Sequence, residues 1–198
     1  MKNQILFLGA AFIMSASVLF AQSNQATVNQ NGIDGTSLVQ QQNINNVAIQ
    51  NQDGTLNGVY ITQTGRNNYA NQNQTDGKKA AYNAPNSPNI NNARIIQNGD
   101  YNKSWQTQTG EWNEAYAKQS GNSNESRQTQ TGWADDAKVY QYGNHNKSWQ
   151  YQYGTAAIGN VNQSGFGNEA TQSQLVGSKY NDASIIQSGD YNKAYQTQ

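Results

Sequence analysis

The sequence contains no cysteine, and its only histidine is His145. The absence of thiols excludes a disulfide scaffold, cysteine catalysis and a Cys/His zinc site. Charged residues are also scarce, at 12% of the chain. The 12 Lys and Arg balance the 12 Asp and Glu, and the absence of a net positive charge argues against a nucleic-acid partner. Hydrophobic residues make up 34% of the chain, against about 45–50% in typical globular domains. We therefore expect no ordinary apolar core, no cofactor and no small-molecule substrate.

Side-chain amides are what the chain has in abundance. It holds 27 Gln and 30 Asn, together 57 of 198 residues, and 10% of its residues are aromatic. Disordered chains usually combine low hydrophobicity with high net charge and few aromatic residues, whereas the net charge here is zero. An uncharged, amide-rich chain with interspersed aromatic residues favours cross-β stacking.

The N-terminal residues 1–21 have a different character from the rest. Lys2 is followed by a largely apolar run over residues 5–20, and Ala21 before Gln22 provides a small-residue cleavage site. The run is shorter than the ~20 residues of a membrane span, and no stop-transfer charges follow it. We interpret residues 1–21 as a secretory signal peptide and residues 22–198 as the mature, secreted protein.

The mature chain is repetitive, with a period of 22 residues that lengthens to 24 before Gln187. Four series of residues keep this period: Gln63, Gln97, Gln119, Gln141, Gln163 and Gln187; Gly65, Gly99, Gly121, Gly143, Gly165 and Gly189; Asn68, Asn102, Asn124, Asn146, Asn168 and Asn192; and, half a period away, Gln72, Gln106, Gln128, Gln150, Gln172 and Gln196. Each member of the last series is followed by a second Gln two residues later. We count seven turns of the repeat, the first at Gln40.

One interval is longer than the others. Gln72 and Gln106 are 34 residues apart, so one repeat carries twelve additional residues. Both prolines of the chain, Pro85 and Pro88, lie in this interval, and proline cannot join the interior of a strand ladder. We predict a loop insertion at residues 78–89.

Within each repeat the residues alternate with period two, and Gly-x-x-Asn or Gly-x-x-Asp interrupts the alternation where the chain must reverse. Two short strands and two tight turns per repeat predict an all-β fold, a β-solenoid of about seven stacked strand–turn–strand coils. Amides of one column can donate to one neighbour and accept from the other, so buried Gln is satisfied along the stack. Three kinds of inward column are expected: the Gln and Asn series; an aliphatic column of Ile61, Ile95, Ala117, Val139, Val161 and Ile185; and a small-residue column of Ala70, Ser104, Ser126, Ser148, Ala170 and Ala194.

The outward positions support the same register. One column alternates in charge, which places opposite charges beside one another on stacking: Lys103, Glu125, Lys147, Glu169 and Lys193. A second column reads Trp105, Arg127, Trp149, which predicts a cation–π stack of a guanidinium between two indoles.

At this point the repeats resemble a known family. QTGEWNEAYAKQ, residues 108–119, matches the curlin repeat of bacterial curli subunits, Gln-x-Gly-x-x-Asn-x-Ala-x-x-x-Gln. Residues 52–63 match with Val59 in place of alanine, and residues 130–141 match with Asp135 in place of asparagine. The resemblance implies a secreted functional amyloid, exported through an outer-membrane pore, nucleated by a minor subunit at the cell surface, and polymerised into fibres for adhesion and biofilm. It departs from the family in its number of repeats, in the insertion, and at Ala157 and Gly159, which replace the Asn and Ala of the motif.

Self-assembly is expected on physical grounds as well, because the last residues, 195–198, lie in a strand pattern and no cap follows it. The final repeat has Lys193 and Asp190 and is not basic, which favours the major fibre subunit over the minor nucleator. An ice-binding or ligand-binding solenoid is the alternative, since Thr107 and Thr129 begin a threonine array, but Tyr151 interrupts it. An enzyme is not expected, because no acid, base and nucleophile set converges with His145.

Overall fold

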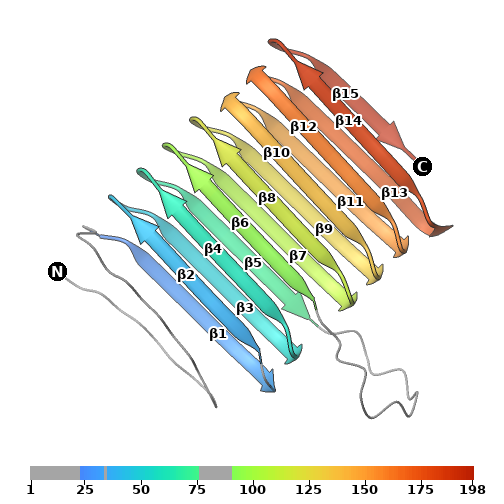
Figure 1. Cartoon of the computed structure of the whole chain (residues 1–198), viewed down its shortest axis with the longest axis horizontal. Coiled ribbons are helices and arrows are strands. Elements are labelled where there is room, and N and C mark those ends of the chain that lie inside the picture. Colours follow the sequence, from blue (N-terminus) through green and yellow to red (C-terminus); the bar gives the residue numbers. More distant parts are fainter. Residues whose placement is uncertain (1–22, 34, 76–90) are drawn as a thin grey trace.

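The computed structural model describes residues 23–33, 35–75 and 91–198. These residues form two parallel β-sheets that face each other (Figure 1). The eight-stranded sheet has the order β1 (Gln25–Ile33), β3 (Val47–Thr55), β5 (Tyr69–Thr75), β7 (Lys103–Glu111), β9 (Glu125–Trp133), β11 (Lys147–Thr155), β13 (Glu169–Lys179) and β15 (Lys193–Thr197). The seven-stranded sheet has the order β2 (Thr36–Gln42), β4 (Gly58–Thr64), β6 (Asn92–Asn98), β8 (Glu114–Ser120), β10 (Asp136–Asn144), β12 (Ile158–Phe166) and β14 (Asp182–Ser188).

Consecutive strands alternate between the two sheets, so the chain winds as a continuous coil. Strands within a sheet are parallel and in register, and the two sheets run in opposite directions (Figure 1). The predicted β-solenoid of about seven coils, with two strands in each coil, is therefore confirmed. Nowhere in the described chain is there a helix with the length and apolar character needed to span a bilayer.

The register accounts for both irregular intervals of the repeat. Gly58 in β4 pairs with Asn92 in β6, and Tyr69 in β5 pairs with Lys103 in β7, so the twelve additional residues fall between β5 and β6. The predicted insertion at residues 78–89 itself lies outside the described residues. The 24-residue interval arises in β13, where the pairing with β11 shifts after Gln152 and accommodates two additional residues.

The first coil differs from the prediction by one residue. Gln41, and not Gln40, pairs with Gln63 and donates to its Oε1 at 2.8 Å, whereas Gln40 pairs with Thr62. Gln40 is exposed on the outer face of the sheet. Three consecutive glutamines, residues 40–42, share this segment, and a shift of one residue exchanges the two faces of a strand.

The interior contains few large apolar side chains. The aliphatic column from Ile61 to Ile185 is aligned across the seven-stranded sheet and no member is more than 6% exposed. The small-residue column faces it from the other sheet and is buried except at Ala194 in the last strand, which is half-buried. Most of the largest fully buried side chains are glutamines. Amide hydrogen bonds, and not apolar volume alone, must therefore hold the two sheets together.

Candidate functional site: the stacked amide ladders

The first glutamine column lies on the seven-stranded sheet and forms an unbroken ladder from Gln41 to Gln187. Each Nε2 donates to Oε1 of the glutamine in the next coil at 2.8–2.9 Å. Each Nε2, that of Gln41 included, also donates to a backbone carbonyl of the opposite sheet, as Gln119 does to Lys103 at 2.9 Å. Both amide protons are thereby satisfied, one along the stack and one across the core, which removes the desolvation penalty of burying an amide.

Two further glutamine columns lie on the eight-stranded sheet. They begin at Gln50 and Gln52 and end at Gln196 and Gln198, and they donate in the same direction, from each coil to the following one. The bonds between central coils are 2.8–2.9 Å long. They lengthen to 3.3 and 3.5 Å at the last coil. In these two columns the bonds are thus shortest between the central coils, whereas the first ladder keeps 2.8 Å at both of its ends.

The asparagine column from Asn68 to Asn192 occupies the corner before each strand of the eight-stranded sheet, and it bonds differently from the glutamines. Asn102 Oδ1 accepts from the backbone N–H of Asn124 in the next coil at 3.0 Å. Asn102 Nδ2 donates to the carbonyl of Gly121 at 2.8 Å. The same pattern recurs along the column, so the corner amides stabilise turns by bonding the backbone of the neighbouring coil.

The glycine column from Gly65 to Gly189 lies in the same corner, and all six members have positive φ. At Gly121, with φ of 117°, a Cβ atom would lie 2.0 Å from the carbonyl oxygen of Gly143 in the next coil. At Gly189 in the last coil the nearest atom would be 3.7 Å away. Stacking, more than the turn itself, therefore excludes side chains at the inner glycines.

The outward charge column is aligned as predicted, with Lys103, Glu125, Lys147, Glu169 and Lys193 paired in succession. Among the described residues of this column, the ion pair is that of Lys193 Nζ with Glu169 Oε2 at 3.6 Å. Exposed pairs contribute about 0–1 kcal/mol each, so the column aligns coils more than it stabilises them.

The column of Trp105, Arg127 and Trp149 is also in register. The close cation–ring approach in the described part of the chain lies elsewhere, where Lys118 Nζ is 5.7 Å from the ring centre of Tyr142. Trp105 contacts the ring of Tyr69, with centroids 5.6 Å apart. Strand alignment brings a cation beside an indole, but the rotamers decide whether it covers the face.

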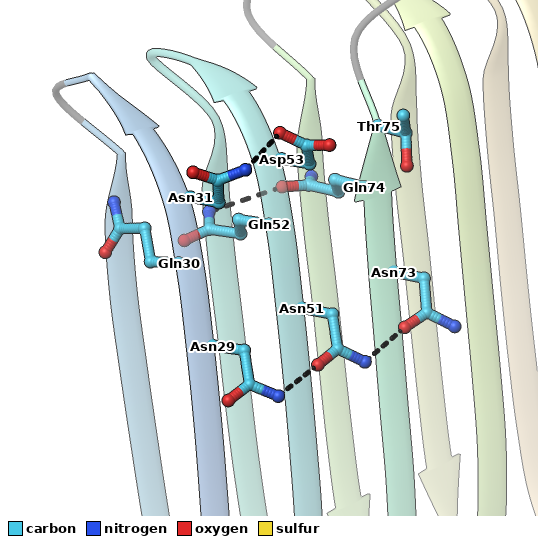
Figure 2. Close-up of a pocket in the computed structure, with 9 residues that line it drawn as sticks. All are labelled: Asn29, Gln30, Asn31, Asn51, Gln52, Asp53, Asn73, Gln74 and Thr75. Carbon is cyan, nitrogen blue, oxygen red and sulfur yellow. Dashed lines mark hydrogen bonds between the residues drawn. The ribbon is translucent and has the colours of Figure 1, made fainter. Parts of the chain in front are cut away.

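An outward asparagine ladder was missed by the sequence reasoning. Asn29 Nδ2 donates to Asn51 Oδ1 at 2.8 Å, and Asn51 Nδ2 donates to Asn73 Oδ1 at 2.6 Å (Figure 2). These residues line a groove of about 600 Å³ together with the residues that follow them in the same three strands, β1, β3 and β5. The 22-residue spacing of the three asparagines was the available signal.

His145 lies in a turn, is exposed, and packs its ring against Phe166 at a centroid distance of 4.9 Å. No group of three or more His, Asp or Glu within the described ranges could hold a metal ion. Neither feature assembles the groups that acid–base or nucleophilic catalysis requires.

A comparison with known protein families gives a match within the repeats. The family model described as "Curlin associated repeat" matches residues 107–132, which run from β7 through β8 to the end of β9. None of the curated proteins matches the chain.

Proposed function

We propose that this chain, whose residues 107–132 match the curlin-associated repeat, is a structural subunit of extracellular curli-like amyloid fibres, which grow by end-to-end β-stacking. The curlin repeat is that of structural amyloid subunits and not of an enzyme family. The observation that supports polymerisation most directly is the open edge of each end coil. Among the described strands, β1 and β2 each have one sheet neighbour, and so do β14 and β15.

Such edges present rows of backbone donors and acceptors that are available to another chain. The glutamine ladders give the two ends complementary chemistry, because the bonded glutamines of all three ladders donate toward the C-terminal coil. The C-terminal end therefore offers amide donors and the N-terminal end offers amide acceptors. A second copy added in the same direction extends sheets and ladders together, whereas an inverted copy would oppose donors to donors. Addition without ring closure produces a filament.

The proposal extends to the setting of the fibre. Residues 1–21 serve as a secretory signal that is removed before Gln22, and the mature chain leaves the cell through an outer-membrane export pore. A nucleator subunit starts growth at the cell surface, and the fibre contributes to adhesion and to the biofilm matrix. The mixed charge of the last coil, with Lys193 and Asp190, supports the major, fibre-forming type of subunit.

Fibre diffraction on the mature chain, residues 22–198, tests the proposal after quiescent incubation in neutral buffer. We expect a meridional reflection near about 4.7–4.8 Å and an equatorial one near about 10 Å. A chain that stayed a folded monomer at high concentration would contradict self-assembly and would favour a ligand-binding solenoid. A thermal-hysteresis measurement on that monomer would then test the ice-binding alternative.

A further inference from the structure

The described strands are odd in number, with eight in one sheet and seven in the other. We propose that successive subunits in the fibre are related by about half a turn around the fibre axis, so that β1 of one copy pairs with β14 of the preceding copy. The eight-stranded sheet of one subunit then continues the seven-stranded sheet of its neighbour. This inference rests on the proposed fibre function and specifies the geometry of its junction.

Strand positions along the stack carry the first argument. β14 and β15 occupy consecutive half-coils on opposite sheets, so the next position along the coil lies beside β14 (Figure 1). A copy added without rotation would place β1 beside β15 and leave that position empty. The gap would be one strand wide, about 4.8 Å, and would leave the edges of β14 and β2 unpaired.

A half-turn fills the position. Rotation about the fibre axis exchanges the two sheets and also reverses their strand directions, which run opposite to each other (Figure 1). β1 of the added copy therefore runs parallel to β14, and β2 runs parallel to β15. Both edges of the junction are then paired, as they are between the coils of one chain.

The inward side chains of β1 carry the second, independent argument. The other seven strands of its sheet have a glutamine at the central inward position, where β1 has Val28. The seven-stranded sheet has aliphatic residues at that position, including Val39 in β2 and Ile185 in β14. Val28 thus has the residue type of the sheet that it would join in the neighbouring copy.

The whole of β1 aligns with β14 on this basis. Asn24 and Asn181 precede the two strands at the same position, and Gly32 and Gly189 follow at the same position. Between them, three inward pairs stack like upon like: Ala26 on Ala183, Val28 on Ile185, and Gln30 on Gln187.

Hydrogen-bonding groups also match at this junction. Gln187 is 6% exposed, and its Nε2 donates to the carbonyl of Glu169 at 3.0 Å, while a second proton remains for the next coil. Gln30 Oε1 is buried and has no donor among the described residues. Its oxygen points away from Gln52 in Figure 2. The junction would join this donor to this acceptor and extend the first glutamine ladder across two subunits.

The second half of the junction pairs β15 with β2. Ala194 then stacks on Ser37 and Gln198 on Gln41, while Gln196 meets Val39. The rotated junction therefore matches five of its six inward contacts. The unrotated junction makes three such contacts, between β15 and β1, and one of them sets Gln196 against Val28.

Cross-linking of engineered cysteines tests the rotation, because the chain has no cysteine of its own. Thr27 in β1 and Ser184 in β14 are exposed and would be direct neighbours across the proposed junction. The matched control pairs Thr27 with Tyr195 in β15, which would be neighbours only without rotation. Fibres of T27C/S184C and of T27C/Y195C are treated with the shortest bis-maleimide, dissolved in strong acid, and separated on denaturing gels.

We expect a ladder of covalent oligomers from T27C/S184C and monomer from T27C/Y195C. The reverse result, or fibres from which neither variant cross-links, would overturn the half-turn junction while leaving the fibre function intact. If the parent chain itself formed no cross-β fibres, the proposed function would fail, and the inference with it.

A second variant separates the two junctions without cross-linking. Val28→Gln restores the glutamine column within the chain, beside Gln50, so it should not weaken the monomer. In the proposed junction it buries an amide against Ile185, and we expect seeded elongation to slow by about tenfold or more, in line with one unsatisfied buried amide. Faster elongation of this variant would instead indicate stacking on Gln196, and would overturn the proposal.

Discussion

Asp135 is the strongest candidate for a stabilising substitution, because it is a carboxylate in a position built for an amide. Its side chain is 1% exposed in the corner before β10. Oδ1 accepts from the backbone N–H of Ala157 at 3.0 Å, but Oδ2 has no hydrogen-bond partner among the residues that the structure describes. The equivalent Asn91 donates Nδ2 to the carbonyl of Gly110 at 2.8 Å. Asp135→Asn should recover that bond.

The magnitude follows from these contacts. The variant removes a buried charge with one unsatisfied oxygen, a penalty of about 1–3 kcal/mol, and gains a hydrogen bond of about 1 kcal/mol. Burial raises the pKa of Asp135, although the Ala157 N–H opposes the shift. The carboxyl is neutral in both states below its unfolded pKa of about 3.9, so the penalty builds up as the pH rises from the unfolded pKa to the higher folded pKa and is complete above it. We expect Asp135→Asn to stabilise the monomer by about 2–4 kcal/mol at pH 7 and by less at pH 4.

Urea denaturation of freshly diluted monomer, followed by tryptophan fluorescence at pH 7 and pH 4, measures this difference. Asp136→Asn is the matched control, because Asp136 lies on the outer face, half-buried, with Oδ2 2.5 Å from Lys138 Nζ and with Oδ1 buried without a partner among the described residues. The control should lose about 0–1 kcal/mol. Two results would refute the reasoning that this corner favours an amide over a carboxylate. One is that Asp135→Asn is no more stable than the parent at pH 7, and the other is that its gain in stability does not decrease at pH 4.

Three further substitutions probe the stack. Gly121→Ala should cost about 1–3 kcal/mol more than Gly189→Ala in monomer denaturation, since both variants have positive φ but only the added Cβ at Gly121 would lie 2.0 Å from a carbonyl oxygen. Equal losses would contradict a stacking constraint. Replacing Gln119 and Gln141 together by Glu should abolish fibre formation in a thioflavin assay, because two buried carboxylates about 4.8 Å apart replace a 2.9 Å hydrogen bond. Normal fibres from this double variant, with the same charges on the outward face as control, would disprove the inward ladder. Ala157→Asn should stabilise the monomer by about 1 kcal/mol, because it restores the amide that most other repeats have in this corner. An unchanged midpoint of urea denaturation would show that an amide at this position forms no stabilising hydrogen bond.

The period of the sequence was sufficient to predict the coil, its two strands and the facing columns, since stacking aligns whatever recurs every 22 residues. It could not assign register where the same residue type is repeated, which is why Gln40 was placed in the column of Gln41. The period also could not identify which atoms accept the hydrogen bonds of the buried amides. The column of Asn102 and Asn124 is visible in the sequence, but its bonds to the backbone of the next coil depend on turn geometry. Side-chain rotamers could not be predicted from the sequence either. Arg127 is aligned with Trp105 and Trp149 as predicted, but the close cation–ring contact in the described residues is that of Lys118 with Tyr142.

An amide core differs from an apolar one in a way that bears on growth. A buried leucine gains most of its stabilisation from any apolar neighbour, whereas a buried glutamine needs a donor and an acceptor at fixed positions. In this chain those partners belong to adjacent coils, so each coil completes the core of the next. Among the described strands the end coils have a neighbour on one side only, and the 3.3 and 3.5 Å glutamine bonds from Gln172 and Gln174 to the last strand are longer than those between central coils of the same two columns. Adding a subunit converts an end coil into a central one on both sides of the junction. The free energy of that conversion, and not the burial of a distinct adhesive patch, is what we expect to drive elongation.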